Sequence, residues 1–365
     1  MGAFELMDGE YEQVVYNHDP VSGLKAIIAI HSTALGPALG GTRFYPYATE
    51  DDALRDVLRL ARGMSYKAAA AGLDLGGGKA VIIGDPKRIK TEALLRAHGR
   101  FVESLAGRYI TAEDVGTFSA DMDVVARETR FVTGRSILNG GGGDPALNTA
   151  YGVLRGMQAV ADELWQSSEL AGRHVVVQGV GKVGYELCRL LHEADVRLTV
   201  ADVDVDNVAR AVNDFRADTA DPHKVHAIPC DVFAPCALGA IINDDTLPEL
   251  ACAAVAGSAN NVLARLEHGR ALRDLGILYA PDYVINAGGL INVADELRGY
   301  SPERARARVE GIFGALRMIF HRAKERGVPT AEAADRLAEE RMREVSRIKL
   351  VRVSPGLGSA PTPAR

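Results

Sequence analysis

The sequence has few residues of the kinds that mark metal-binding, disulfide-linked or membrane-embedded proteins. Only four of its 365 residues are cysteine, and none of them forms a CxxC pair, so we expect neither a metal site nor a disulfide framework. No run reaches the roughly 18 apolar residues that a membrane span needs, and the first ten residues contain no apolar core of signal-peptide length. We therefore expect a cytoplasmic protein with no membrane partner.

The chain also lacks an excess of positive charge. Its 48 acidic residues outnumber its 42 basic residues and give a net charge of −6. Nucleic-acid binding depends on basic side chains that neutralise phosphates, so this composition disfavours a nucleic-acid partner. The hydrophobic fraction (47%) and the charged fraction (25%) are those of an ordinary globular protein. At roughly 150 residues per domain, the length indicates two to three domains.

Glycine is the residue in excess. It occupies 38 positions, above the usual ~7%, whereas the 15 prolines are not in excess. This imbalance points to specific tight turns instead of flexible linkers.

The first third of the chain predicts an α/β unit of its own. Short strands between Glu12 and Arg43 indicate an antiparallel or mixed sheet, and a helix beginning near Thr49 has apolar residues at three- and four-residue spacing. That helix ends close to Lys67. Further elements are expected in this order: a strand at Lys79–Ile83, a helix at Thr91–Leu105, a strand at Tyr109–Ala112 and a helix at Ala120–Arg127.

The second part of the chain predicts a different architecture. The run Asn139–Pro145 contains four consecutive glycines and is typical of an interdomain turn, and a long helix is expected at Ala146–Trp165. Strands and helices then alternate strictly, which indicates a doubly wound parallel sheet; strands are expected at His174–Gln178 and Arg197–Ala201 and near Val225, Val232, Ala253 and Ile277. Residues 301–347 are expected to be helical.

We therefore predict an α/β fold of two domains. The first, residues 1–133, would bind substrate and make the subunit contacts, with part of 326–350 packing back on it. The second, residues 134–325, would be a Rossmann-type cofactor-binding domain. The tail, residues 354–365, is rich in Pro, Gly, Ser and Ala and is predicted to be disordered.

A dinucleotide-binding motif follows the predicted strand at His174–Gln178. It reads Gly179-Val180-Gly181-Lys182-Val183-Gly184, and a second strand then ends at Asp202. The first glycine permits a tight turn, the second admits a pyrophosphate to the backbone, and the third allows close helix packing. An acidic residue at Asp202 would accept the ribose hydroxyls and repel a 2′-phosphate, which favours NAD over NADP.

Several motifs resemble those of the glutamate/leucine/phenylalanine/valine dehydrogenases, and most closely the branched-chain (valine/leucine) branch. They span residues 23–347 and include Gly36-Pro37-Ala38-Leu39-Gly40-Gly41-Thr42-Arg43, Gly76-Gly77-Gly78-Lys79, Ser258-Ala259-Asn260-Asn261 and Pro281-Asp282-Tyr283-Val284-Ile285-Asn286-Ala287-Gly288-Gly289.

The resemblance implies NAD-dependent, reversible oxidative deamination of an L-amino acid to its 2-oxo acid and ammonia by a homo-oligomer. Lys67 would hold the substrate α-carboxylate. Lys79 would polarise the developing carbonyl and the attacking water, and Asp114 would carry protons between that water and the substrate nitrogen. The backbone of Gly40 and Gly41 would help seat the substrate. Asn261 would position the nicotinamide ring.

The same resemblance predicts which amino acid is used. The glutamate branch has a lysine where this chain has Leu39 and a serine where it has Val293, so a side-chain carboxylate would be left unpaired. An apolar pocket is expected from Leu39, Ala112, Thr133, Leu290 and Val293. Its size favours valine, leucine or isoleucine. Phenylalanine is the alternative substrate, and a non-catalytic NAD-sensing protein is a remote alternative function.

Overall fold

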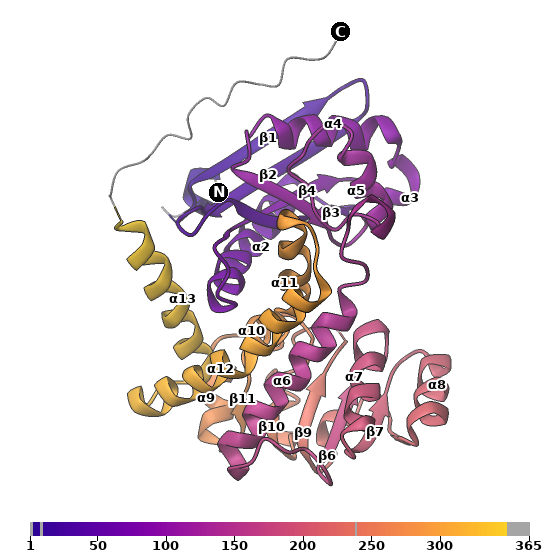
Figure 1. Cartoon of the computed structure of the whole chain (residues 1–365), viewed down its shortest axis with the longest axis vertical. Coiled ribbons are helices and arrows are strands. Elements are labelled where there is room, and N and C mark those ends of the chain that lie inside the picture. Colours follow the sequence, from indigo (N-terminus) through magenta and orange to yellow (C-terminus); the bar gives the residue numbers. More distant parts are fainter. Residues whose placement is uncertain (1–2, 8–9, 238, 349–365) are drawn as a thin grey trace.

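The computed structural model describes residues 3–7, 10–237 and 239–348. The ribbon separates into an upper lobe built from the first third of the chain and a lower lobe built from the middle (Figure 1). The C-terminal helices return from the lower lobe toward the upper one. The predicted disordered tail at 354–365 lies outside the described residues.

The upper lobe is organised on a five-stranded mixed sheet in the order β1-β2-β4-β3-β5. Strands β1 and β2 pair antiparallel, as do β2 and β4, whereas β3 runs parallel to both β4 and β5. The mixed sheet that the sequence predicted is therefore present. Its strands are β1 (Gln13–Asp19), β2 (Leu24–Ser32), β3 (Ala38–Tyr45), β4 (Gly76–Ile83) and β5 (Tyr109–Glu113).

Helices cover both faces of this sheet. Ile27 and Ala29 of β2 pack in one cluster with Val57 of the helix α2, whereas their neighbours Ile28 and Ile30 pack in another with Leu94 of the helix α4. Two buried faces explain why β2 is almost continuously apolar instead of alternating. The helices of this lobe are α1 (Ala3–Met7), α2 (Glu50–Ala70), α3 (Pro86–Ile89), α4 (Glu92–Glu103) and α5 (Ser119–Val125).

The lower lobe contains a six-stranded sheet in the order β11-β10-β9-β6-β7-β8, in which every pair is parallel. The chain moves outward from β6 through β7 to β8 and then returns to β9 on the other side. This reversal places a crevice at the carboxyl ends of β6 and β9. The strands are β6 (His174–Gln178), β7 (Arg197–Ala201), β8 (Asp218–Thr219), β9 (Cys230–Pro235), β10 (Cys252–Val255) and β11 (Leu278–Tyr279).

One predicted strand is wrong. The segment near Val225 forms a short 3-10 helix, η2 (Val225–Ala227), where a strand was expected. The preceding Asp221-Pro222 pair begins a turn, in which the Asp221 carboxylate accepts a hydrogen bond from the His223 amide at 2.9 Å. The remaining elements of this lobe are α6 (Ala146–Trp165), α7 (Lys182–Glu193), α8 (Val205–Phe215), α9 (Glu267–Asp274), η1 (Ile137–Asn139) and η3 (Leu247–Glu249).

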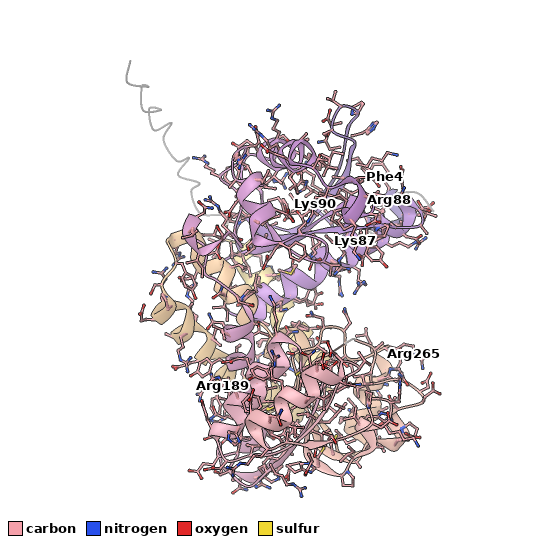
Figure 2. The ribbon with its side chains drawn as sticks, turned by 90° about the vertical axis from the view of Figure 1, so that its right-hand side faces the viewer. Phe4, Lys87, Arg88, Lys90, Arg189 and Arg265 are labelled. Atoms are coloured by element: carbon pink, nitrogen blue, oxygen red, sulfur yellow. The ribbon has the colours of Figure 1, made fainter. Side chains whose placement is uncertain are left out.

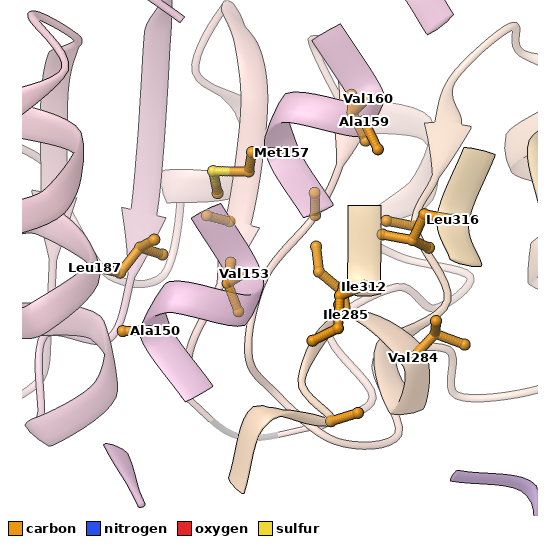
Figure 3. Packing of buried hydrophobic residues seen from close by; sticks show 14 of the residues in the cluster. Ala150, Val153, Met157, Ala159, Val160, Leu187, Val284, Ile285, Ile312 and Leu316 are labelled. Atoms are coloured by element: carbon orange, nitrogen blue, oxygen red, sulfur yellow. The ribbon is translucent and has the colours of Figure 1, made fainter. Parts of the chain in front are cut away.

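The main hydrophobic core surrounds the long helix α6 (Figure 3). Val153 and Met157 of α6 are fully buried beside Ile285 and Leu316. A Cβ at Gly156 would lie 2.3 Å from Cγ1 of Ile285, so this glycine is what allows the helices to approach. The C-terminal helices are α10 (Asp282–Ile285), α11 (Gly288–Asp295), η4 (Glu296–Arg298), α12 (Pro302–Arg326) and α13 (Thr330–Ser346).

The last helix joins the two lobes. Ala338 of α13 is buried with Tyr66 and Ala69 of α2. The Tyr66 hydroxyl donates a hydrogen bond to Glu339 at 2.7 Å, and Arg341 donates to the backbone of Ala69 at 3.0 Å. Residues more than 260 positions apart in the sequence therefore hold α2 in place. No helix within the described part of the chain is both long and apolar enough to cross a membrane.

Charged side chains project from both lobes (Figure 2). Of the labelled cations, Lys90 pairs with Asp121 at 2.7 Å, Arg189 with Glu186 at 2.5 Å and Arg265 with Asp244 at 2.6 Å. These three cations are thus locally balanced by carboxylates.

Candidate active site

A cavity of about 540 Å³ lies between the two lobes. One wall comes from β3, β4, β5 and the C-terminal end of α2, the opposite wall from the start of α7 and the loop after β10, and the third from α11 and the start of α6. The following predicted site residues line it: Leu39, Gly40, Gly41, Lys67, Lys79, Ala112, Asp114, Lys182, Val183, Leu290 and Val293. The fold thus brings together residues from both halves of the sequence.

Lys79 and Asp114 form an ion pair at the cavity wall. Lys79 lies in β4, with its side chain 7% exposed, and its Nζ is 3.2 Å from Oδ1 of Asp114, which directly follows β5. Burial alone would raise the pKa of Asp114, but the charges of Lys79 and Arg43 outweigh it and hold that pKa below its usual value. Asp114 is therefore a carboxylate at neutral pH.

Lys67 faces the same cavity from the last turn of α2. Its Nζ donates to Oδ1 of Asn260 at 3.5 Å. Enclosure by the protein, together with the charge of Lys79, lowers the pKa of Lys67 to about 8, against the opposite effect of Asp282 and Asp114. A cation that pays this desolvation cost gains most from an anionic ligand, so Lys67 is suited to bind a carboxylate.

Glycines allow the elements that carry these lysines to meet. A Cβ at Gly40 would lie 1.8 Å from the carbonyl oxygen of Gly78, and one at Gly77 would lie 2.0 Å from the amide nitrogen of Ser65. Real Cβ atoms essentially never approach this closely. Gly77 is two residues before Lys79, and Ser65 is two residues before Lys67. The glycine run therefore sets the spacing between the two lysines.

The apolar part of the cavity wall agrees with most of the predicted pocket. Leu39, Ala112, Leu290 and Val293 line it, and so does Met64, which the sequence interpretation omitted. Thr133, which was also expected in the pocket, does not line the cavity. Its side chain is buried, and its hydroxyl donates to the carbonyl oxygen of Thr111 at 3.4 Å.

The predicted glycine loop connects β6 to α7. Gly179 has φ +92°, and a Cβ at Gly184 would lie 1.9 Å from the carbonyl oxygen of Gly179. In contrast, nothing lies within 4 Å of a Cβ position at Gly181. The first amides of α7 have no partner within the helix and attract negative charge. The loop therefore offers open space and amide donors for a pyrophosphate, as a dinucleotide requires.

Asp202 has a structural contact that its sequence position does not reveal. Its Oδ2 accepts from the amide of Val180 at 2.7 Å and its Oδ1 from the amide of Asp204 at 2.9 Å. The carboxylate thus fixes the glycine loop to the end of β7. Each oxygen has two lone pairs, so both retain an acceptor site for a ribose hydroxyl.

Of the two neighbours Asn260 and Asn261, the cavity is lined by Asn260. Asn260 lines the cavity and accepts from Nδ2 of Asn286 at 2.8 Å. Asn261 is exposed, has φ +52° and does not line the cavity; its carbonyl accepts from the amide of Ala240 at 2.6 Å. The left-handed residue turns the chain, so adjacent side chains point in different directions.

Three further charged residues were missed. Glu113 and Asp144 line the cavity, and Asp144 is 3.2 Å from Lys182 at the start of α7. Arg43 lies between the two elements of the ion pair, and its Nε is 2.8 Å from Oδ2 of Asp114. Glu113 and Arg43 stand within recognised motifs, which was the available signal. The contact between Arg43 and Asp114 depends on strand order, which no motif specifies.

Comparisons with known proteins agree with this geometry. The family model described as "Glu/Leu/Phe/Val dehydrogenase, dimerisation domain" matches residues 11–131, and "Glutamate/Leucine/Phenylalanine/Valine dehydrogenase" matches residues 196–348. A leucine dehydrogenase of Geobacillus stearothermophilus is 56% identical over 350 residues, which cover 96% of this chain and 95% of the relative. A valine dehydrogenase of Streptomyces virginiae is 56% identical over 342 residues, 93% of this chain and 96% of the relative.

Solved structures give the same result. The crystal structure of an L-tryptophan dehydrogenase from Nostoc punctiforme superposes with a TM-score of 0.85 at 48% identity, covering 94% of this chain and 99% of that one. A hetero-hexameric glutamate dehydrogenase from Thermus thermophilus superposes with a TM-score of 0.78 at 26% identity, covering 96% and 92%. Membership of one protein family thus explains both the two-domain α/β fold and the motifs. The chain belongs to the glutamate/leucine/phenylalanine/valine dehydrogenase family.

Proposed function

We propose that this protein catalyses the reversible oxidative deamination of a branched-chain L-amino acid with NAD. In the forward direction the amino acid, NAD⁺ and water give the 2-oxo acid, ammonium, NADH and a proton. The observation that carries the proposal is the Lys79–Asp114 ion pair at 3.2 Å, which shares one cavity with Lys67 and with an apolar wall. The leucine and valine dehydrogenases at 56% identity support the same activity.

The charges in the cavity give each end of an amino acid a partner. Lys67 would bind the α-carboxylate, because its half-buried side chain forms no ion pair within the described structure. The side chain would lie against Leu39, Ala112, Leu290 and Val293. The Cα and the amino group would then lie near Lys79 and Asp114, which line the same cavity.

Proton transfer is assigned to the ion pair. Ionised Asp114 would accept a proton from the substrate nitrogen or from the attacking water, and the ammonium of Lys79 would stabilise negative charge that develops on the carbonyl oxygen. Because Asp114 stays ionised at neutral pH, it is ready to accept a proton without prior deprotonation.

The residues of the second lobe fit NAD. The amides at the start of α7, with the open space at Gly181, would hold the pyrophosphate, and Asp202 would accept the ribose hydroxyls and disfavour the 2′-phosphate of NADP. When bound, the nicotinamide supplies the acceptor for the hydride that leaves the substrate Cα. Asn260, on the cavity wall, is suited to fix the orientation of the substrate beside it.

The cavity supports an aliphatic substrate. In the described wall, the side chain of a glutamate substrate would meet the apolar groups of Leu39 and Val293. The same wall contains Glu113 and Asp144, whose charges have the same sign as the substrate's carboxylate. A second carboxylate would therefore be buried without a partner, at a cost of several kcal/mol. Phenylalanine remains the alternative within the same mechanism, since each methylene of pocket size is worth only about 1–3 kcal/mol. The tryptophan dehydrogenase that superposes on this chain shows that the fold admits an aromatic substrate.

A homo-oligomer is proposed as the working form. The matched model of residues 11–131 is described as a dimerisation domain, and the glutamate dehydrogenase that superposes is hetero-hexameric, which supports an oligomer. Closure of the cleft is also proposed, since it would exclude water from the reacting atoms.

The test is NAD⁺ reduction by the purified protein with L-valine, L-leucine, L-isoleucine, L-phenylalanine or L-glutamate. We expect the aliphatic amino acids to give the highest kcat/KM and glutamate to give none. Lys79→Ala should abolish turnover while NAD binding persists. Lys87→Ala is the matched control, because Lys87 is exposed on α3, outside the cavity. Unchanged turnover in Lys79→Ala would refute the assignment of the site.

A further inference from the structure

Arg43 lies between the two strands that carry the ion pair. Strand β3 is the neighbour of β4 on one side and of β5 on the other. Lys79 is in β4, Asp114 follows β5, and Arg43 is in β3, where it pairs with Val81 of β4. The sheet order thus places a guanidinium beside a carboxylate that is 71 residues away in the sequence.

The guanidinium of Arg43 contacts two carboxylates through different nitrogens. Its Nε donates to Oδ2 of Asp114 at 2.8 Å, and its NH1 donates to Oδ2 of Asp56 at 2.9 Å. Asp56 is itself fixed by the Tyr47 hydroxyl at 2.7 Å and by Arg59 at 2.8 Å. Arg43 is therefore anchored from the side that faces away from Asp114.

These contacts divide the Asp114 carboxylate between two partners. Oδ2 is taken by Arg43, and Oδ1 is 3.2 Å from Lys79. The backbone is fixed as well, because the Asp114 amide donates to the Thr117 hydroxyl at 2.9 Å. A carboxylate that is held by one oxygen presents the other in a constant direction.

We propose that Arg43 is a positioning residue of this enzyme: it holds Oδ2 of Asp114 so that Oδ1 alone meets Lys79 and exchanges protons with the substrate. The proposal rests on the role given to Asp114 in the proposed function. Arg43 itself does not line the cavity, so it acts through Asp114 and not on the substrate.

The charge of Arg43 also affects when Asp114 is ionised. Arg43 and Lys79 both lower the pKa of Asp114 against the effect of burial. Loss of Arg43 would raise that pKa, and the acidic limb of the pH profile would move to higher pH. The titratable and charged groups around Asp114 are Arg43, Tyr47, Asp56, Lys67, Lys79 and Tyr109. Among the described residues, only Arg43 and Lys79 contact its carboxylate within 3.2 Å.

A lysine at position 43 would not reproduce this arrangement. The guanidinium reaches Asp114 and Asp56 at once because its nitrogens are fixed in one plane, whereas an ammonium is a single point at the end of a flexible chain. Arg43→Lys keeps the charge and loses the simultaneous contacts. It therefore separates the electrostatic effect of Arg43 from its geometric effect.

The experiment measures kcat and kcat/KM for the best amino acid between pH 3 and pH 10 in Arg43→Met, Arg43→Lys and Arg59→Met. We expect Arg43→Met to lower kcat about ten- to hundredfold, as loss of a charge-assisted hydrogen bond does, and to move the acidic limb to higher pH. Arg43→Lys should move the limb by less than half as much and recover part of kcat. KM should change little, since Lys67 is untouched.

Arg59→Met is the matched control. Arg59 also contacts Asp56, at 2.8 Å, and no contact joins it to Asp114 within the described structure. Its pH profile should be that of the parent enzyme. A shift in this variant equal to that of Arg43→Met would overturn the proposal, because it would trace the effect to Asp56 alone.

Asp114→Asn distinguishes failure of this inference from failure of the proposed function. If Asp114→Asn loses turnover while folded Arg43→Met keeps the parent kcat and acidic limb, the role of Arg43 is refuted and that of Asp114 stands. If Asp114→Asn retains turnover, the role of Asp114 in the proposed function is refuted, and the inference about Arg43 that rests on it is refuted as well. Should Arg43→Met not fold, Arg43→Lys decides, and a parent-like kcat in that variant overturns the positioning role.

Discussion

Replacement of Gly77 by alanine tests whether close contact between β4 and α2 builds the site. An added Cβ would lie 2.0 Å from the amide nitrogen of Ser65, 2.3 Å from its Oγ and 2.5 Å from its Cα. Three atoms of one residue, two of them backbone, block the same space. A rotamer change cannot relieve the clash, so the helix must move away from the strand by about 1 Å.

The expected cost follows from this displacement. Overpacking of a core costs typically 1–3 kcal/mol, and a backbone contact falls at the upper end. The lower entropy of an unfolded alanine chain returns roughly 0.4–1 kcal/mol. The net loss is about 2–2.6 kcal/mol, which lowers Tm by roughly 5–10 °C for a domain of this size.

The same displacement should impair catalysis. Lys79 follows Gly77 by two residues in β4, and Lys67 follows Ser65 by two residues in α2, so separation of the backbones separates the two lysines. A misplacement of about 1 Å costs up to roughly a hundredfold in rate. We expect Gly77→Ala to lose most of its kcat even where it remains folded.

The assays are thermal unfolding followed by circular dichroism, and NAD⁺ reduction at a temperature well below the transition. Gly63→Ala is the control, since Gly63 is in the same helix and nothing lies within 4 Å of its Cβ position. It should gain up to about 1 kcal/mol of helix propensity and keep full activity. A Gly77→Ala protein with the parent Tm and kcat would refute this account of the glycine run.

Three further outcomes are expected. Because the pKa of Lys67 is about 8, its ammonium is lost above that pH, and the Kd of the 2-oxo acid for the NADH complex should rise about tenfold per pH unit above 8; a Kd that stays constant from pH 7 to 9.5 would contradict the carboxylate assignment. Leu290→Ala widens the apolar wall and should raise the phenylalanine-to-leucine ratio of kcat/KM about ten- to hundredfold, measured by steady-state kinetics; an unchanged ratio would remove Leu290 from the pocket. Thr49→Ala removes the N-cap of α2, where the hydroxyl accepts from the Asp52 amide at 3.1 Å, and should lower Tm by roughly 2–4 °C with kcat unchanged; Thr49→Ser should restore Tm, and a lower kcat in Thr49→Ala would speak against a purely local cap.

Elements with a strong local signal were predicted closely. The helix at Ala146–Trp165 and the strands at His174–Gln178 and Arg197–Ala201 have the bounds that the structure gives. Each is a periodic or continuously apolar segment between residues that end regular structure. The neighbouring residues in the sequence therefore fix where the element begins and ends. The segment near Val225 has only a short apolar signal after Asp221-Pro222, and there the turn prevailed over the strand.

The predicted site residues were named because they adjoin glycine motifs, but their side-chain partners could not be named from the sequence. Asn260, and not Asn261, faces the cavity because a left-handed φ of +52° at Asn261 turns the chain. Thr133 faces the backbone of Thr111 instead of the cavity. A motif match does not specify which of two neighbouring residues faces a cavity, or in which direction a side chain points.

The sequence by itself determined the two-domain α/β class and the glycine loop after β6, and its resemblance to the family predicted Lys67, Lys79 and Asp114 as site residues. These predictions depend on local spacing and residue type, which can be read from the sequence without knowledge of the tertiary structure. Only the tertiary structure decided that Arg43 lies between Asp114 and Asp56, because strand order places β3 between β4 and β5. Contacts between residues distant in the sequence arise from packing, and no local pattern encodes them.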